Sequence, residues 1–137
     1  MNPALLPSAV PLTDPDATLY RAIAKGYVTN GVVGFEAFMP RTAEGNLLST
    51  DQARLSTATQ TAARRGREVH GVHGVSIADI EAIATGHGFP VPVYDDHDAT
   101  DPMLEAHASI DMSASPTKVR RQALAASLLL ASQLAQP

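Results

Sequence analysis

The C-terminal segment constrains the fold of this chain more than any other part of it. Ser115-Pro116 favours a helix start, because proline is tolerated at the first helical position. We predict a long helix from Thr117 to about Ala135, which is apolar on nearly all sides from Ala123 onward. A helix of this kind has to be buried centrally or shared with another subunit.

The apolar surface of this predicted helix divides into two adjacent stripes. The first stripe contains Val119, Ala123, Ala126, Leu130 and Leu134, and the second contains Leu124, Leu128, Ala131 and Ala135. A single sheet face covers one stripe more easily than both, and a large apolar patch left in water usually marks an interface. We therefore expect a homodimer in which the second stripe packs against its copy across a twofold axis. The alternative is a helix that runs through the middle of its own domain.

The rest of the chain predicts alternating strands and helices. Residues 1–16 contain four prolines and are expected to form a Pro-rich extended arm, followed by a single domain over residues 17–137. The expected elements are a strand or short helix at 18–27, a β-prone segment at 32–39, helices at 51–65 and 77–85, strands at 69–75 and 104–112, and a proline-interrupted edge strand at 89–94. This order predicts a compact α+β domain. It combines a small mixed or antiparallel sheet with two short helices and the long apolar C-terminal helix.

Composition excludes several classes of function. The 137 residues fit one domain, and the absence of cysteine excludes a disulfide framework and thiol chemistry. The net charge of −4 argues against general nucleic-acid binding, which needs several cations to displace counterions from phosphates. The N-terminus makes a poor signal peptide, and the longest apolar run is too short to span a membrane. We expect a soluble, cytoplasmic protein.

The histidines and acidic residues do not form a recognisable metal motif. His70 and His73 lie three apart in EVHGVHGVSI, and residues three apart on a regular strand point to opposite faces. The acidic loop that begins at Asp95 lacks the glycine and glutamate that an EF-hand requires at its sixth and twelfth positions. Zinc sites need converging nitrogen or sulfur ligands. We therefore predict no bound metal and no cofactor.

Residues 104–112 show the clearest period-2 alternation in the chain. Glu105, His107 and Ser109 fall on the polar side of this expected strand, and a carboxylate near an imidazole can fix its tautomer. Ser49 is a possible nucleophile, although no Gly-x-Ser-x-Gly motif surrounds it. One functional hypothesis is therefore a small enzyme in which Arg21 clamps an anion, Ser49 anchors a ligand, Glu105 supplies a carboxylate and His107 acts as a general base.

Two patches of opposite charge favour a different function. Arginines cluster before residue 68 and acids cluster after residue 94, and either patch can dock a partner of opposite charge. The leading hypothesis is a small bacterial binding or accessory protein, such as an immunity protein or an antitoxin, that acts by protein contact. The candidate contact residues are Arg64, Arg65, Arg67, Asp95, Asp96, Asp98 and Asp101.

Several short motifs follow the order found in a loosely defined family of small uncharacterised bacterial proteins. Leu19-Tyr20-Arg21, Phe35 to Pro40, Leu47 to Thr50 and Glu105 to Ile110 carry this resemblance, which implies no particular activity.

A second set of residues is similar to the Arg–Ser–Glu pattern of ADP-ribosyltransferases. Arg21, Ser49-Thr50 and Glu105 occur in the order of that family. Asp51 stands where the family has its last serine, and His107 stands where it has a second acid. The resemblance implies an ADP-ribosyltransferase-like site at these residues, and the two departures put its catalytic acid in doubt.

Overall fold

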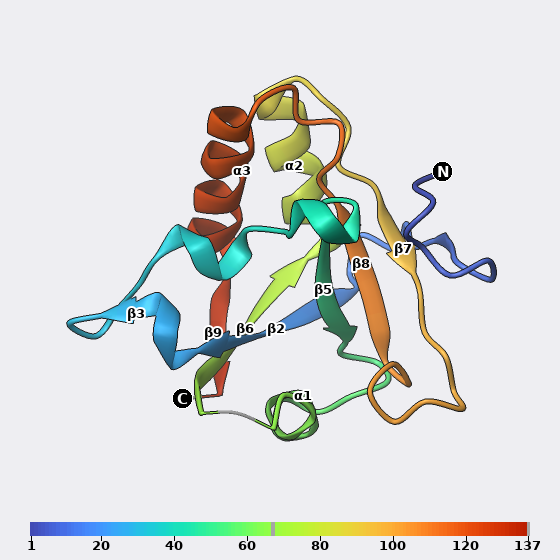
Figure 1. The fold of residues 1–137 in the computed structure, drawn as a ribbon, viewed down its shortest axis with the longest axis vertical. Helices are drawn as coiled ribbons and strands as arrows, with labels where there is room; N and C mark the ends of the chain where they lie inside the picture. The colour runs from blue at the N-terminus through green and yellow to red at the C-terminus, as the bar shows by residue number, and fades with distance from the viewer. Residues whose placement is uncertain (67, 137) are drawn as a thin grey trace.

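Seven antiparallel strands form the sheet on which the other elements lie. The structure is a computed structural model that describes residues 1–66 and 68–136. In the described chain the strand order is β1-β7-β8-β5-β2-β6-β9 (Figure 1). The strands span Val10–Pro11 (β1), Thr18–Ala24 (β2), Leu47–Gln52 (β5), Val69–Ser76 (β6), Val93–Asp95 (β7), His107–Asp111 (β8) and Gln133–Gln136 (β9).

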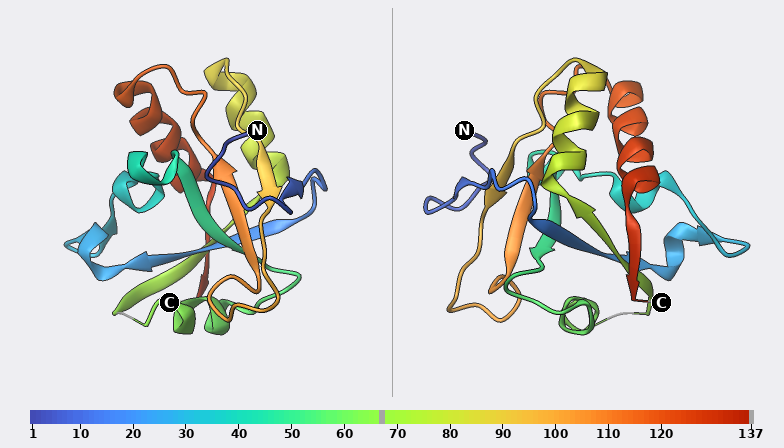
Figure 2. Two further views of the ribbon diagram at one scale, coloured as in Figure 1. Left: turned by 45° about the vertical axis from the view of Figure 1, so that its right-hand side comes forward. Right: turned by 180° about the vertical axis from the view of Figure 1, so that it is seen from behind.

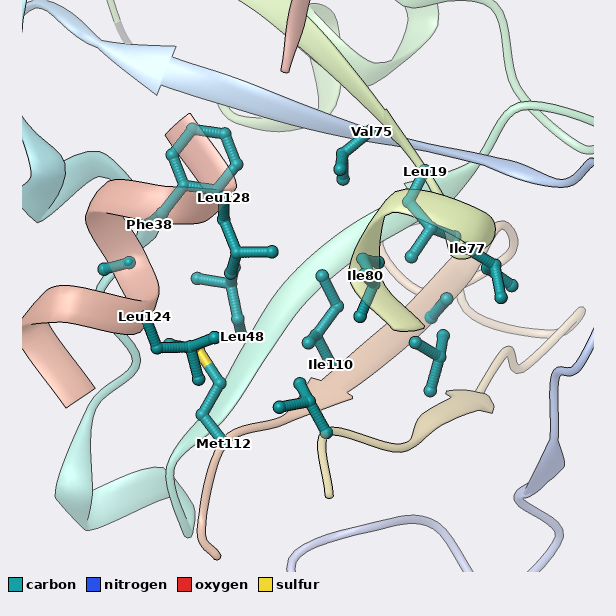
Figure 3. Packing of buried hydrophobic residues seen from close by; sticks show 14 of the residues in the cluster. Leu19, Phe38, Leu48, Val75, Ile77, Ile80, Ile110, Met112, Leu124 and Leu128 are labelled. Atoms are coloured by element: carbon teal, nitrogen blue, oxygen red, sulfur yellow. The ribbon is translucent and has the colours of Figure 1, made fainter. Parts of the chain in front are cut away.

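Two helices cover one face of this sheet and form the core with it. Helices α2 (Ile77–His87) and α3 (Lys118–Ala131) lie side by side (Figure 2). The 3-10 helix η2 (Phe35–Phe38) packs against α3 and buries Phe38 completely. Figure 3 shows side chains from both helices, η2 and the central strands meeting in this layer. They include Leu19, Leu48, Val75, Ile77, Ile80, Ile110, Met112, Leu124 and Leu128.

Shorter elements lie at the edges of the sheet. Helix α1 (Ala58–Arg64) lies at the opposite end of the molecule from α2 and α3 (Figure 1). The strands β3 (Val28–Thr29) and β4 (Val32–Val33) form a separate hairpin, with η1 (Lys25–Tyr27) before it. Asn30 and Gly31 both have positive φ, as a two-residue hairpin turn requires. The 3-10 helix η3 (Thr42–Glu44) precedes β5.

The predicted α+β architecture and antiparallel sheet are confirmed, but one helix was placed wrongly. Residues 51–65 were expected to be a helix capped near Ser49 or Thr50, whereas Leu47–Gln52 form β5. The helix begins later, at Ala58, where Thr57 and Gln60 form a reciprocal capping box. Leu47 and Leu48, the two apolar residues that start β5, are buried. Their burial favours a strand here and overrides the local preference for a helix.

The long apolar C-terminal helix is also corrected. Helix α3 ends at Ala131, because Ser132 is extended, and the next residues pair with β6 as strand β9. Ala135 therefore lies on a strand and not on the helix. Leu124 and Leu128 are fully buried in the domain's own core, whereas Val119 and Leu130 of the other stripe are 72% and 86% exposed. Leu124 and Leu128, which were expected at a dimer interface, are therefore part of the core, and the homodimer stays a prediction.

Residues 1–16 were expected to form an extended arm, whereas residues 1–9 pack on the outer face of the sheet and residues 10–11 join the sheet as β1. Strand β1 pairs with β7, and Leu5 and Ala9 are buried against Leu47 and Tyr94. The side chain of Asn2 donates a hydrogen bond to the carbonyl oxygen of Gly45.

The buried stripe of α3 gives a first prediction. Leu128→Ala removes a fully buried side chain and leaves a cavity, so the free energy of unfolding should fall by about 2–5 kcal/mol. Leu130→Ala on the same helix is the matched control and should change this value by less than about 0.5 kcal/mol, because Leu130 is exposed. Urea denaturation measures both. Equal losses for the two variants would contradict the described burial.

The histidine pair of β6 is separated by the strand geometry. His70 is exposed, whereas His73 is partly buried and its Nδ1 lies 2.9 Å from the hydroxyl of Ser132, where α3 turns into β9. That hydroxyl donates to the carbonyl oxygen of Leu129, so it accepts from His73. Burial lowers the pKa of His73 below its usual value of 6.5, and the nearby His70 lowers it further.

The lowered pKa of His73 makes its contribution to stability depend on pH. Neutral His73 stabilises the fold above the unfolded pKa, and this contribution is lost as pH falls through the folded pKa. The difference in unfolding free energy between the wild type and His73→Asn should therefore shrink between about pH 7.5 and about pH 5.5. Urea titrations at both pH values measure it, and His70→Asn serves as the exposed control. Parallel pH curves for wild type and His73→Asn would refute this role.

Within residues 1–66 and 68–136, every helix is too short or too polar to cross a membrane.

Candidate functional site

The outer face of the sheet, away from α2 and α3, carries a row of polar side chains. Tyr20 pairs with Asp51 across β2 and β5, and Asp51 pairs with His107 across β5 and β8. Ser49 likewise pairs with Ser109. Cross-strand partners share a face, and residues two apart on one strand do too. These five side chains therefore lie on one surface, although they come from three separate segments of the chain.

Ser49 and His107 meet at the centre of this surface. The hydroxyl oxygen of Ser49 lies 2.6 Å from Nε2 of His107, which is hydrogen-bonding distance. His107 is only partly exposed, with 13% of its side chain accessible. The structure thus brings together two of the residues that the sequence singled out for a polar site.

The other nitrogen of His107 faces Asp96. Nδ1 lies 3.2 Å from the carbonyl oxygen of Asp96 and 3.6 Å from its carboxylate oxygen Oδ2. The carbonyl is therefore the hydrogen-bond partner, and the carboxylate places a negative charge close to the imidazole. A hydrogen on Nδ1 that is donated to this carbonyl leaves Nε2 as an acceptor for the hydroxyl hydrogen of Ser49.

Asp96 is itself held in place by two further hydrogen bonds. Its side chain is buried and accepts from the backbone N–H of Leu6 at 2.9 Å and from the hydroxyl of Ser109 at 3.0 Å. These bonds come from the N-terminal segment and from β8, so they fix the carboxylate from two sides. Asp96 was predicted as a contact residue for a partner, whereas the structure turns it inward as a third member of the Ser49–His107 cluster.

A cavity opens directly above this cluster. It encloses about 160 Å³ between the outer sheet face, α1 and the loop before β8. Ser49, His107 and Tyr20 line it from the sheet, and the exposed residues Arg65 and Met103 also contribute to its lining. The full set of lining residues is Tyr20, Ala22, Ser49, Thr50, Asp51, Thr61, Arg64, Arg65, Met103, Leu104 and His107.

Arg64 fastens α1 over this cavity. Its guanidinium forms ion pairs of 2.8 Å with Asp51 on β5 and with Glu105 in the loop, and it also bonds to the hydroxyl of Ser56. Burial lowers the pKa of Arg64, but the bonds to Glu105 and Asp51 raise it more, so the net pKa is raised. Arg64 was expected in a partner-binding patch and Glu105 in a catalytic site. In the structure, both are engaged in this internal network.

Arg21 occupies the place where β2 and β5 separate. Pairing between these strands covers Leu19–Gln52 and Tyr20–Asp51. Beyond it, Arg21 donates from Nη1 to the carbonyl oxygen of Ser49 and from Nε to that of Ala37, both at 2.9 Å. Burial lowers the pKa of Arg21 to about 10. Arg21 therefore contacts the backbone of Ser49 and does not line the cavity that contains the Ser49–His107 contact.

The remaining acidic residues of the predicted contact patch are engaged by other residues of the chain. Asp95 contacts Gln52, Arg54 and His97. Burial raises its pKa, but the hydrogen bonds from His97 and Gln52 outweigh burial and hold the pKa below its usual value. Asp98 accepts from Thr100, and Asp101 accepts from the N–H of Met103. Arg65 is exposed, and Arg67 lies outside the described residues.

No group of three metal-ligating side chains converges in the described part of the chain. The absence of a metal and of a cofactor stays a prediction.

The chain matches no protein-family model, no curated protein and no solved structure. The two resemblances inferred from sequence motifs therefore remain untested.

The Arg64 network yields a prediction about stability. Arg64→Gln breaks the largely buried pair with Asp51 and the more exposed pair with Glu105, and it leaves Asp51 without its cation. The free energy of unfolding should therefore fall by about 2–4 kcal/mol. Arg65→Gln, one residue along, should cost less than about 0.5 kcal/mol because Arg65 is exposed. Urea denaturation compares them, and a double-mutant cycle with Asp51→Asn isolates the Arg64–Asp51 coupling. Independent effects of Arg64→Gln and Asp51→Asn would show that this pair does not hold α1.

Proposed function

We propose that this protein is a small serine-dependent hydrolase that cleaves short acyl esters. The observation that supports this proposal most is the 2.6 Å contact between the Ser49 hydroxyl and Nε2 of His107 at the wall of a cavity. A serine is a weak nucleophile until an adjacent base takes its proton, and a histidine oriented by a third group is the usual base. Asp96 is placed to be that third group.

The reaction follows from these positions. Oγ of Ser49 attacks the ester carbonyl carbon, and its proton passes to Nε2 of His107. The tetrahedral intermediate collapses, the C–O bond to the alcohol breaks, and the alcohol leaves with the proton from His107. Water then gives a proton to the same imidazole and attacks the acyl-serine. The C–Oγ bond breaks, Oγ of Ser49 takes the proton back from His107, and the carboxylic acid leaves. The Asp96 carboxylate stabilises the positive imidazolium that forms in both halves.

The lining of the cavity suggests how the oxyanion is held. Thr61 is engaged by Ser56, and Arg64 by Asp51 and Glu105. Tyr20 lines the same space and carries a phenolic hydroxyl that can donate a hydrogen bond. A hydrogen-bond donor aimed at the developing negative charge stabilises the transition state. The small volume of about 160 Å³ favours a short acyl group.

Protein contact, with a cytoplasmic bacterial partner or a second copy, is the second candidate. Its support is now the exposed apolar stripe of Val119 and Leu130 on α3, together with Leu134 on β9, and not the residues first assigned to it. Gel filtration and a pull-down distinguish the two functions, because a hydrolase needs no stoichiometric macromolecular partner.

Substitution at the cluster tests the hydrolase. Ser49→Ala and His107→Gln should each lower kcat/KM for a nitrophenyl ester of a short acid by at least about 10³-fold, because each removes a group that acts in the chemical step. Asp96→Asn should lower kcat with less effect on KM. Ser113→Ala and His70→Gln change the same residue types at exposed positions and should leave the rate unchanged.

Labelling with a fluorophosphonate, which reacts with activated serines, gives an independent measurement. Mass spectrometry should find the adduct on Ser49 in the wild type and on no residue in Ser49→Ala. Labelling at another serine, or hydrolysis that persists in Ser49→Ala, would refute the proposed nucleophile.

A further inference from the structure

A second, larger cavity adjoins the first one where β2 and β5 separate. It encloses about 350 Å³, and Arg21, Tyr27, Arg41, Glu44 and Arg65 contribute to its lining. Ala22, Ser49, Arg65 and Met103 line both cavities. The two spaces are therefore neighbours, and the proposed nucleophile lies between them.

Positive charge gathers around this second cavity although the chain as a whole is acidic. Three arginines and one glutamate line it, while the net charge of the protein is −4. Glu44 lies 3.9 Å from Arg41, and both side chains are mostly exposed, so this pair is weak. Arg21 and Arg65 have no carboxylate partner within ion-pair distance in residues 1–66 and 68–136.

Arg21 is the most constrained of these cations. Its two hydrogen bonds, to the carbonyl oxygens of Ala37 and Ser49, fix the plane of the guanidinium and leave Nη2 unbonded among the described groups. Burial is the main cause of its lowered pKa of about 10, and repulsion by Arg65 is the next. A buried cation that faces other cations gains most from an anion that enters the space between them.

We propose that the second cavity binds an anionic group, a carboxylate or a phosphate, of the substrate that is cleaved at Ser49. Arg21 and Arg65 hold the anion, because guanidinium groups match the geometry of both oxyanions and bind them by paired hydrogen bonds. Arg41 adds charge at the exposed side. The substrate class rests on the proposed hydrolase, whereas the anion site itself stands on the arginines.

This arrangement explains why the two cavities share a wall. A substrate with its acid group between Arg21 and Arg65 extends past Ala22 and Ser49 into the smaller cavity, where its ester carbonyl meets Oγ of Ser49. Arg21 bonds to the carbonyl oxygen of Ser49, so the residue that binds the anion also positions the strand that carries the nucleophile. Binding of the remote acid group then serves to orient the reacting group.

Direct binding tests the anion site without any catalysis. Inorganic phosphate and succinate are titrated into the Ser49→Ala protein by isothermal calorimetry at low ionic strength, which separates the two anion types. We expect binding that weakens as salt is added, because the contact is electrostatic. Arg65→Gln should weaken it by about tenfold, since one charge-assisted contact is lost. Lys118→Gln removes one exposed positive charge from the start of α3 and should leave it unchanged.

Arg21→Gln should abolish the binding, and circular dichroism shows whether that variant folds. If it does not fold, Arg65→Gln still decides the question. The absence of binding by both anions, or binding equally strong in Arg65→Gln, overturns the anion site.

Hydrolysis separates this inference from the proposed function. The nitrophenyl monoester of succinate, which carries a free carboxylate, should be cleaved with a kcat/KM at least about tenfold above that of nitrophenyl acetate, and Arg65→Gln should remove most of this preference. Hydrolysis of both esters at equal rates refutes the anion site and leaves the hydrolase standing. Anion binding without hydrolysis of either ester refutes the hydrolase and leaves the anion site.

Discussion

The fold depends on how Arg21 closes the gap between two halves of the sheet. One half contains β2, β6 and β9, and the other contains β5, β8, β7 and β1. The ladder that joins them ends after Tyr20 and Asp51, so the backbone groups beyond that point need other partners. The guanidinium satisfies one of these groups, the carbonyl oxygen of Ser49, and it also donates to the carbonyl oxygen of Ala37 in η2. It thereby ties β5 and η2 to β2 and leaves a space beside the gap.

The two faces of the sheet serve different purposes as a result. The face under α2 and α3 is packed with aliphatic side chains, and Phe38 is the one aromatic residue fully buried within the described core. The outer face is covered more thinly, by α1 and residues 1–11, and it keeps polar side chains in contact with cavities. Arg64 holds α1 in place through its ion pairs with Asp51 and Glu105, so α1 stays packed over the polar cluster.

Local sequence signals predicted much of the fold and two members of the candidate site. The strand at 69–75 and the helix capped by Ser76 were both predicted, and the structure confirms them as β6 and α2. The period-2 pattern placed His107 and Ser109 on one face, which is correct for β8. The partnership of Ser49 with His107 depends on the register of β5 against β8, and that register is set by packing and not by local sequence.

The elements that were predicted wrongly also depend on tertiary contacts and not on local sequence. Residues 133–136 continue an apolar helical pattern, yet they form β9 because the open edge of β6 offers backbone partners. The role of Asp96 could not be predicted, since it requires β7 to lie beside β8 and the N-terminal segment to lie near both. From sequence alone, an acidic loop is expected to be solvated surface, because its tertiary partners are not known.

The hydrogen bond from Leu6 to Asp96 links residues 1–9 to the Ser49–His107 cluster. A segment that is held by few buried contacts opens at a small fraction of the free energy of global unfolding, and residues 1–9 bury only Leu5 and Ala9. When residues 1–9 lift from the sheet, Asp96 loses a donor, and His107 loses part of the support that orients its ring. The Ser49–His107 geometry therefore depends on the packing of this segment. A fusion or a cleavage near the first residues can disturb the polar cluster while the core under α2 and α3 stays folded.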